Sequence, residues 1–254
     1  MSRYLICFSP TGGAKKCADA FTAAWDGGWE LIDLCDPKFD AAAWKLTADD
    51  LAVAAIPAYG GRMPFIASER MAKLAGNGAQ AILLCVFGNR AFEDTMIEMH
   101  DILTAGGFRP VAAVAAIAEH SMMRQFAVGR PDVSDRIELA AFGMRIRKKL
   151  EDEKDDSIVS VPGNRPYKFY PGSAVKPLVS DACTGCGECA KTCPVGAIAP
   201  AKPNTTNTDV CVGCMRCVTV CPAGARAGDP AVIAGIVEKV GAALSGRKEN
   251  SLYL

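Results

Sequence analysis

CTGCGECAKTCPVGA, residues 183–197, recurs 28 residues later as CVGCMRCVTVCPAGA, residues 211–225. Each copy spaces its cysteines as C-x2-C-x2-C-x3-C and follows the last one with proline, which is the bacterial signature of a [4Fe–4S] cluster. In this signature the first three cysteines bind one cluster, and the fourth binds the other cluster. The sequence therefore predicts two clusters that exchange one ligand. One is expected on Cys183, Cys186, Cys189 and Cys221, and the other on Cys211, Cys214, Cys217 and Cys193.

Two other uses of clustered cysteines fit this chain less well. Disulfides belong mostly to secreted domains, and the five apolar residues before Ser9-Pro10 are too few for a secretion signal. Zinc sites usually pair C-x2-C units and do not run four cysteines together. Clusters and free thiols both indicate a reducing cytoplasm with little oxygen.

Composition indicates two domains and narrows the range of partners. Eight of the twelve cysteines lie between residues 183 and 221 of a 254-residue chain, which separates a cysteine-rich part from the rest. The 28 basic and 28 acidic side chains balance, so nothing indicates a nucleic acid or a charged membrane as partner. The longest apolar run, Val111 to Ala118, is far below the roughly 18 residues of a membrane span. The sequence does not predict the oligomeric state.

The N-terminal part alternates apolar runs with helical patterns. Buried strands are predicted at Tyr4–Phe8, Glu30–Leu34, Leu51–Ile56, Ala81–Phe87 and Val111–Ile117. Helices are predicted at Lys15–Trp25, Pro64–Leu74, Phe92–Leu103 and Ser134–Leu150. This alternation is typical of an α/β domain whose parallel sheet is covered on both faces.

Three loops that follow predicted strands carry unusual residues. The loop at 9–15, SPTGGAK, joins hydroxyls and glycines to a helix N-terminus, whose free N–H groups can bind an anion. The loops at 57–64 and 87–92 combine glycines with aromatic residues, which suits a flat ring with a phosphate tail. The predicted cofactor-binding residues are Ser9, Thr11, Gly12, Gly13, Ala14, Pro57, Ala58, Tyr59, Gly60, Gly61, Phe87, Gly88, Asn89, Arg90 and Phe92.

The first of these loops resembles the phosphate loop of flavodoxins, which reads roughly S/T-x-T-G-x-T. The matching residues are Ser9, Thr11, Gly12 and Gly13. Ala14 stands where the family has its last threonine, so one phosphate hydroxyl is missing. The resemblance implies a sheet of order 2-1-3-4-5 with FMN at the switch point. It also implies that Tyr59 lies by one face of the flavin and residues 88–92 by the other, with Phe92 near the place of the usual stacking tyrosine.

The cysteine runs resemble the two-cluster ferredoxins of bacteria, and the whole chain resembles flavodoxin–ferredoxin fusion proteins of anaerobic bacteria. The motifs FSPTGG, PAYGGRMP and FGNRAFED, the HS and GRPD elements and both cysteine runs carry this resemblance. It implies a flavodoxin-like, doubly wound, five-stranded parallel sheet and a smaller α+β ferredoxin domain. We expect the flavodoxin-like, FMN-binding domain at residues 1–156, a Pro- and aromatic-rich connector at 157–174, and the ferredoxin domain with a C-terminal helix at 175–254.

Several other residues have both a functional and a plain interpretation. Arg62 and Arg90 lie in the loops expected at the flavin. A cation there would raise the reduction potential of the flavin, whereas in the plain interpretation both side chains are solvated surface charges. His120 is either a hydrogen-bonded loop residue or a proton relay to the flavin. The last helix, Asp229–Leu244, is expected to bury a stripe of Ile233, Ile236, Val237 and Val240. The polar tail after Gly246 is expected to fray. The remaining cysteines, expected as small buried hydrophobes, are Cys7, Cys17, Cys35 and Cys85.

These features favour a cytoplasmic electron carrier that relays electrons between FMN, two [4Fe–4S] clusters and an external redox partner protein. One alternative is a flavin-dependent reductase of a small substrate, although no nucleophile or nicotinamide motif supports it. The other is a cluster-only ferredoxin with a vestigial flavodoxin-like domain, because Ala14 removes a phosphate contact. Whether the chain is an enzyme stays open from the sequence.

Overall fold

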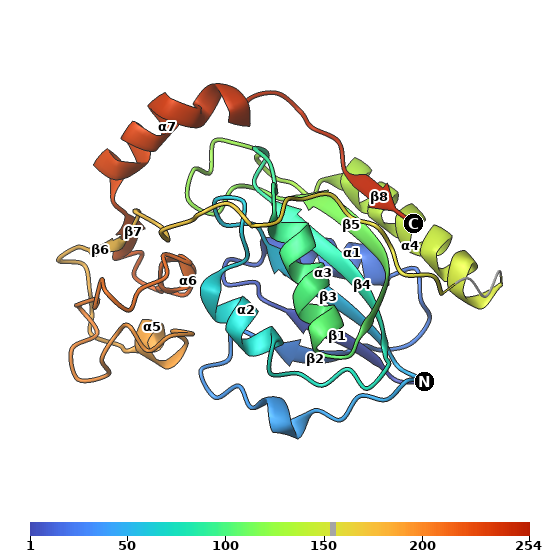
Figure 1. The fold of residues 1–254 in the computed structure, drawn as a ribbon. Helices are drawn as coiled ribbons and strands as arrows, with labels where there is room; N and C mark the ends of the chain where they lie inside the picture. Colours follow the sequence, from blue (N-terminus) through green and yellow to red (C-terminus); the bar gives the residue numbers. More distant parts are fainter. Residues whose placement is uncertain (153–155) are drawn as a thin grey trace.

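The computed structural model describes residues 1–152 and 156–254, so residues 153–155, just before the predicted domain boundary at 156, lie outside the described residues. A six-stranded sheet forms the first domain, with the strand order β2-β1-β3-β4-β5-β8 (Figure 1), in which β8 is the C-terminal strand Ser251–Tyr253. The five parallel strands are β1 (Arg3–Cys7), β2 (Glu30–Asp33), β3 (Leu51–Pro57), β4 (Gln80–Phe87) and β5 (Arg109–Ile117). The predicted order 2-1-3-4-5 is confirmed.

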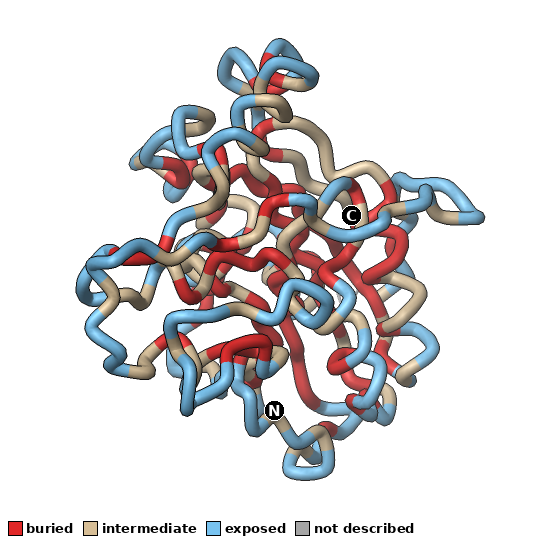
Figure 2. The backbone as a smooth tube through the Cα atoms, turned by 90° about the vertical axis from the view of Figure 1, so that its left-hand side faces the viewer, coloured by how far each residue is buried: buried red, intermediate tan, exposed pale blue. Residues whose placement is uncertain are grey.

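Helices cover both faces of this sheet because its central strands carry apolar side chains on both sides. The helices are α1 (Gly13–Thr22), α2 (Phe65–Met71), α3 (Thr95–Ala105) and α4 (Val133–Glu151), with a 3-10 turn at Ala41–Ala43. One buried core joins α1 and α4 to the sheet, and a second core joins α2 and α3 to the other face. Figure 2 shows these buried segments at the centre of the molecule. Among the described residues, no helix combines the length and apolar character that a membrane crossing needs.

The cysteine repeat folds as a separate small module, which we define as residues 177–228 (left side of Figure 1). Its ends pair as two antiparallel strands, β6 (Pro177–Val179) and β7 (Arg226–Gly228). Two short helices, α5 (Glu188–Lys191) and α6 (Arg216–Thr219), begin 28 residues apart, as the repeat does. The backbone repeats as well, because positive φ angles occur at equivalent positions in the two copies. These pairs are Gly185 and Gly213, Gly187 and Met215, and Gly196 and Gly224.

The C-terminal segment returns from the module to the first domain. Helix α7 (Pro230–Leu244) is capped by Asp229, whose carboxylate accepts hydrogen bonds from the first turn. Its predicted apolar stripe is only partly buried. The expectation of a frayed tail is wrong, because β8 (Ser251–Tyr253) pairs antiparallel with β5. Polar residues hold this tail in place: Asn250 Oδ1 accepts from Ile117 N at 2.9 Å, and Asn250 Nδ2 donates to Glu138 at 2.6 Å.

The connector runs along α3 before it enters the module. Lys168 N donates to Asp94 at 2.7 Å, and Asn164 N donates to the same carboxylate at 2.8 Å. The Tyr167 hydroxyl donates to Asp101 at 2.5 Å. The module is therefore tethered to the first domain on both sides, by the connector before it and by β8 after it.

Candidate cofactor sites

The eight cysteines of the repeat lie around two cavities in the module. The first, which we call the Cys183 cavity, is lined by Cys183, Cys186, Cys189 and Cys221. The second, which we call the Cys211 cavity, is lined by Cys211, Cys214, Cys217 and Cys193. Each cavity takes three cysteines from one copy of the repeat and the fourth from the other copy. The structure thus brings together the two sets of four that the spacing predicts.

Backbone N–H groups point at the sulfur atoms in both cavities. Ala197 N lies 3.3 Å from Cys193 Sγ, and the equivalent Ala225 N lies 3.3 Å from Cys221 Sγ. Such N–H···S contacts stabilise negative charge on cluster ligands. Across residues 1–152 and 156–254, no three Cys, His, Asp or Glu side chains are grouped to hold a single metal ion. A [4Fe–4S] cluster, by contrast, distributes its four ligands over several iron atoms.

The two cavities differ in their exposure. Cys186 of the Cys183 cavity is exposed, whereas three of the four cysteines of the Cys211 cavity are buried. Burial raises the pKa of Cys214 to about 12 and the pKa of Cys217 to about 11. Sulfurs with such high pKa values become thiolate ligands when the positive charge of iron compensates them.

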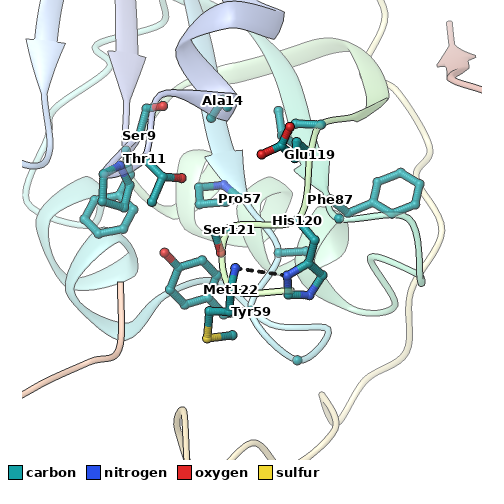
Figure 3. A pocket seen from close by; sticks show the side chains of 18 of the residues that line it. Ser9, Thr11, Ala14, Pro57, Tyr59, Phe87, Glu119, His120, Ser121 and Met122 are labelled. Carbon is teal, nitrogen blue, oxygen red and sulfur yellow. Dashed lines mark hydrogen bonds between the residues drawn. The ribbon is translucent and has the colours of Figure 1, made fainter. Parts of the chain in front are cut away.

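A third site, which we call the edge pocket, lies at the carboxyl ends of the parallel strands (Figure 3). Of the predicted cofactor-binding residues, it is lined by Ser9, Thr11, Gly13, Ala14, Pro57, Ala58, Tyr59, Gly60, Phe87 and Gly88. The predicted residues that do not line it are Gly12, Gly61, Asn89, Arg90 and Phe92. Residues that the sequence did not single out as cofactor-binding complete the wall, among them Glu119, His120, Ser121, Met122 and Tyr170.

The 9–15 loop has the geometry of an anion cradle. Ser9 Oγ accepts a hydrogen bond from Lys15 N at 2.9 Å, which fixes the loop against the first turn of α1. Gly12 precedes that turn with φ +90°, a left-handed conformation that favours glycine. The Lys15 ammonium pairs with Asp19 at 2.6 Å. A phosphate here would depend on backbone N–H groups and hydroxyls.

The turn after β3 and the connector place two tyrosines, Tyr59 and Tyr170, in the wall of the edge pocket. Tyr59 and Arg62 exchange backbone hydrogen bonds of 2.8 and 3.1 Å, and Gly60 and Gly61 between them have φ +59° and +88°. Positive φ at both central residues is the signature of a type I′ turn. A Cβ atom on Gly60 would lie 2.5 Å from the ring of Tyr170, so this connector tyrosine packs directly on the turn. The remaining cavity volume is about 100 Å³, below the roughly 300 Å³ of typical ligand pockets.

The loop after β4 is directed toward the C-terminal tail. Asn89 Nδ2 donates to Leu244 O at 2.5 Å and to Gly246 O at 2.7 Å. Lys248 Nζ donates to Arg90 O at 2.7 Å, and the Arg90 guanidinium pairs with the Glu93 carboxylate. This part of the loop therefore anchors the tail and lies outside the edge pocket.

Arg62 has a structural partner of its own. Its guanidinium makes two bonds to the nearly buried carboxylate of Glu98, at 2.8 and 2.9 Å, and it stacks over the ring of Tyr167 at 4.7 Å. Neither Arg62 nor Arg90 lines the edge pocket. The positions of these two guanidinium groups give no support to the hypothesis that they raise the potential of a flavin.

His120 is held as a neutral side chain in the wall of the edge pocket. Its Nδ1 accepts from Met122 N at 3.2 Å (Figure 3) and from Met123 N, also at 3.2 Å. Burial lowers the pKa of His120 to about 4, with a smaller contribution from Arg90. The proton of the neutral ring is therefore on Nε2, which leaves that nitrogen as a donor. This favours the hydrogen-bonded interpretation over a proton relay.

The edge pocket and the Cys211 cavity are connected by packing across the domains. Cys214 belongs to the same buried core as Cys35 of the first domain, and Tyr59 packs against that core. Burial, followed by the nearby Cys214 and Cys35, raises the pKa of Tyr59 well above its ordinary value. Arg70 of α2 also links the first domain to the module, because its Nη2 donates to Pro194 O at 2.8 Å.

The family comparison agrees with the two cysteine cavities. Residues 182–225 match the family model of the 4Fe-4S dicluster domain. The chain joins a flavodoxin-like domain to a 4Fe-4S dicluster domain. The flavodoxin-like sheet is defined by its strand order. A dicluster domain on such a sheet indicates redox chemistry and electron transfer.

Solved structures with similarity to this chain include two flavodoxins and an azoreductase. Oxidised flavodoxin 1 from Bacillus cereus is 15% identical, with a TM-score of 0.41 over 59% of this chain and 100% of that chain. The Streptococcus pneumonia TIGR4 flavodoxin is 16% identical, with a TM-score of 0.40 over 58% of this chain and 99% of that chain. The azoreductase from Bacillus anthracis str. Sterne is 15% identical, with a TM-score of 0.34 over 60% of this chain and 100% of that chain. No curated protein matches the sequence.

Proposed function

We propose that this protein relays electrons between FMN in the edge pocket, two [4Fe–4S] clusters in the cysteine cavities, and an external redox protein. When bound, FMN exchanges two electrons and can do so singly, while each cluster carries one. The observation that carries the proposal is the position of Tyr59. This residue lines the edge pocket and also packs on the buried core that contains Cys214.

The two cavities have different roles in this proposal. Cys214 is buried against the flavodoxin-like domain, so the cluster in the Cys211 cavity is the one that exchanges electrons with FMN in the neighbouring edge pocket. Cys186 is exposed on the Cys183 cavity, so the cluster there exchanges electrons with a partner protein. Cys193 and Cys221 each reach into the opposite cavity, which fixes the distance between the two clusters.

Both tethers support a relay of fixed geometry. The connector is bonded to α3, and β8 is bonded to β5, so the dicluster domain is held on both sides. Arg70 adds a third attachment, because the same guanidinium donates to Leu34 O at 2.7 Å, Asp36 O at 2.8 Å and Pro194 O at 2.8 Å. Electron exchange in this arrangement needs no swing of the dicluster domain.

A cluster-only ferredoxin is the second candidate, and two observations favour it. Ala14 lacks the hydroxyl that a flavodoxin phosphate loop has at its end, and the edge pocket has a volume of only about 100 Å³. FMN therefore requires Tyr59 or Tyr170 to move aside. The same small volume counts against a reductase, since a substrate would have to share this pocket with the flavin.

Anaerobic purification of the full chain, with iron and FMN quantified per chain, tests the proposal. The relay predicts about eight iron atoms and about one FMN. About eight irons without FMN, even after incubation with excess FMN, would leave only the cluster-only ferredoxin. A chain that holds zinc or no metal would contradict both candidates.

A further inference from the structure

Arg226 is a buried cation in the wall of the Cys183 cavity. Its exposed fraction is 3%, which makes it one of the most buried charged side chains of the chain. It lies one residue after Ala225, whose backbone N–H contacts Cys221 Sγ. The cavity that it lines is otherwise formed by four cysteines and small residues.

The hydrogen bonds of Arg226 go only to neutral oxygens. Its Nη1 donates to Thr206 Oγ1 at 2.9 Å, and its Nη2 donates to Thr205 O at 3.1 Å and to Pro203 O. In the described part of the chain, no carboxylate lies within ion-pair distance of this guanidinium. A buried charge without a counter-charge is costly, so buried charges in proteins are normally paired.

The repeat shows that the charge is not required by the fold of the module. The residue 28 positions earlier is Ile198, which lines the Cys211 cavity and is equally buried. The two motifs end as CPVGAI and CPAGAR, so the same backbone position accepts an apolar side chain in one copy. The Cys211 cavity has an arginine of its own, Arg216, which is less buried than Arg226 as a whole residue.

We propose that Arg226 is the internal counter-ion of the cluster pair and holds the reduction potentials of the clusters up, most strongly in the Cys183 cavity. A [4Fe–4S] centre with four thiolates is anionic and gains a further negative charge on reduction. A buried cation stabilises that reduced form more than the oxidised form. The same cation therefore lowers the free-energy cost of placing an electron on the cluster in the Cys183 cavity.

This inference rests on the cluster part of the proposed function and does not depend on FMN. Redox titrations of the anaerobic full-length protein, followed by electron paramagnetic resonance, measure the two cluster potentials. We expect Arg226→Gln to lower at least one potential by about 59 mV or more, which corresponds to a tenfold loss in the stability of the reduced form. Arg226→Lys, which keeps the charge, should stay close to the wild type. Lys202→Gln removes an exposed charge from a neighbouring loop and should change neither potential.

Each other outcome also decides the question. A Gln variant that holds about eight irons with unchanged potentials would overturn the proposal, and so would a Lys variant shifted as far as the Gln variant. If the Gln variant loses iron while the Lys variant retains it, the charge is required and the proposal stands. If both variants lose iron, the role of Arg226 is to hold the 203–206 loop by hydrogen bonds, and the proposal fails. A wild-type protein without iron would refute the proposed function before any variant is compared.

Discussion

In the proposed arrangement each cysteine run supplies its fourth cysteine to the cluster of the other run. The iron content of cysteine variants can therefore be predicted. The structure groups the eight cysteines as two sets of four, and we propose that each set binds four iron atoms. Cys189 and Cys221 belong to the same set, although they lie in different runs. The double variant Cys189→Ala/Cys221→Ala should therefore lose one cluster and keep about four irons per chain. Cys217 and Cys221 lie in the same run but in different sets, so Cys217→Ala/Cys221→Ala should keep almost none.

The assay is iron quantification on anaerobically purified protein, with the single variants alongside. Each single alanine variant should lose at most about four irons, because the other set stays complete. Both double variants remove two cysteines, so general destabilisation of the module affects them alike. The reasoning is refuted if the Cys217/Cys221 variant keeps about four irons while the Cys189/Cys221 variant loses nearly all. That pattern would mean that each run binds its own cluster.

Four further substitutions, one of them a matched control, test the surroundings of the sites. Gly60→Ala should lower the stability of the protein by about 1–2 kcal/mol from the strain of the left-handed backbone alone. The loss should be larger still, because the new Cβ would lie 2.5 Å from the Tyr170 ring. The control is Gly12→Ala, where φ is +90° and the surrounding space is open, so only the backbone strain should appear. Arg70→Met leaves three main-chain carbonyls without their donor, each worth roughly 1.5–3 kcal/mol, so the thermal midpoint should fall clearly, and an unchanged midpoint would argue against docking through this residue. His120 has a folded-state pKa of about 4, below the ordinary 6.5, so the unfolded chain binds the proton first and stability should fall as pH drops from about 6.5 to about 4. His120→Gln should lessen this fall, and an identical pH profile would contradict the buried neutral ring.

The sheet and the grouping of the cysteines could be predicted because local patterns determine them. The parallel strands are continuous apolar runs, and a strand buried on both faces has this signature. The cysteine spacing is equally local, since loops of two residues bring three sulfurs of a run together. Ser9 and Tyr59 lie in the edge pocket for the same reason, as both directly follow strand ends.

What could not be predicted depends on contacts between distant parts of the chain. Asn89 was expected at the flavin, but its amide bonds Leu244 and Gly246, which lie more than 150 residues later. Strand β8 has three residues, too short for any periodic pattern, and its pairing depends on the free edge of β5. Tyr170 sits in a segment without regular structure, and only the path of the connector brings its ring onto Gly60.

The relay is tested most directly by the rate of electron exchange between FMN and the clusters after a light pulse reduces the flavin. Tyr59 and Cys214 meet in one buried core, so the exchange should occur within a single chain. The account predicts first-order rates that stay constant over a tenfold range of protein concentration. Rates that rise in proportion to concentration, or clusters that stay oxidised beside a reduced flavin of lower potential, would contradict it.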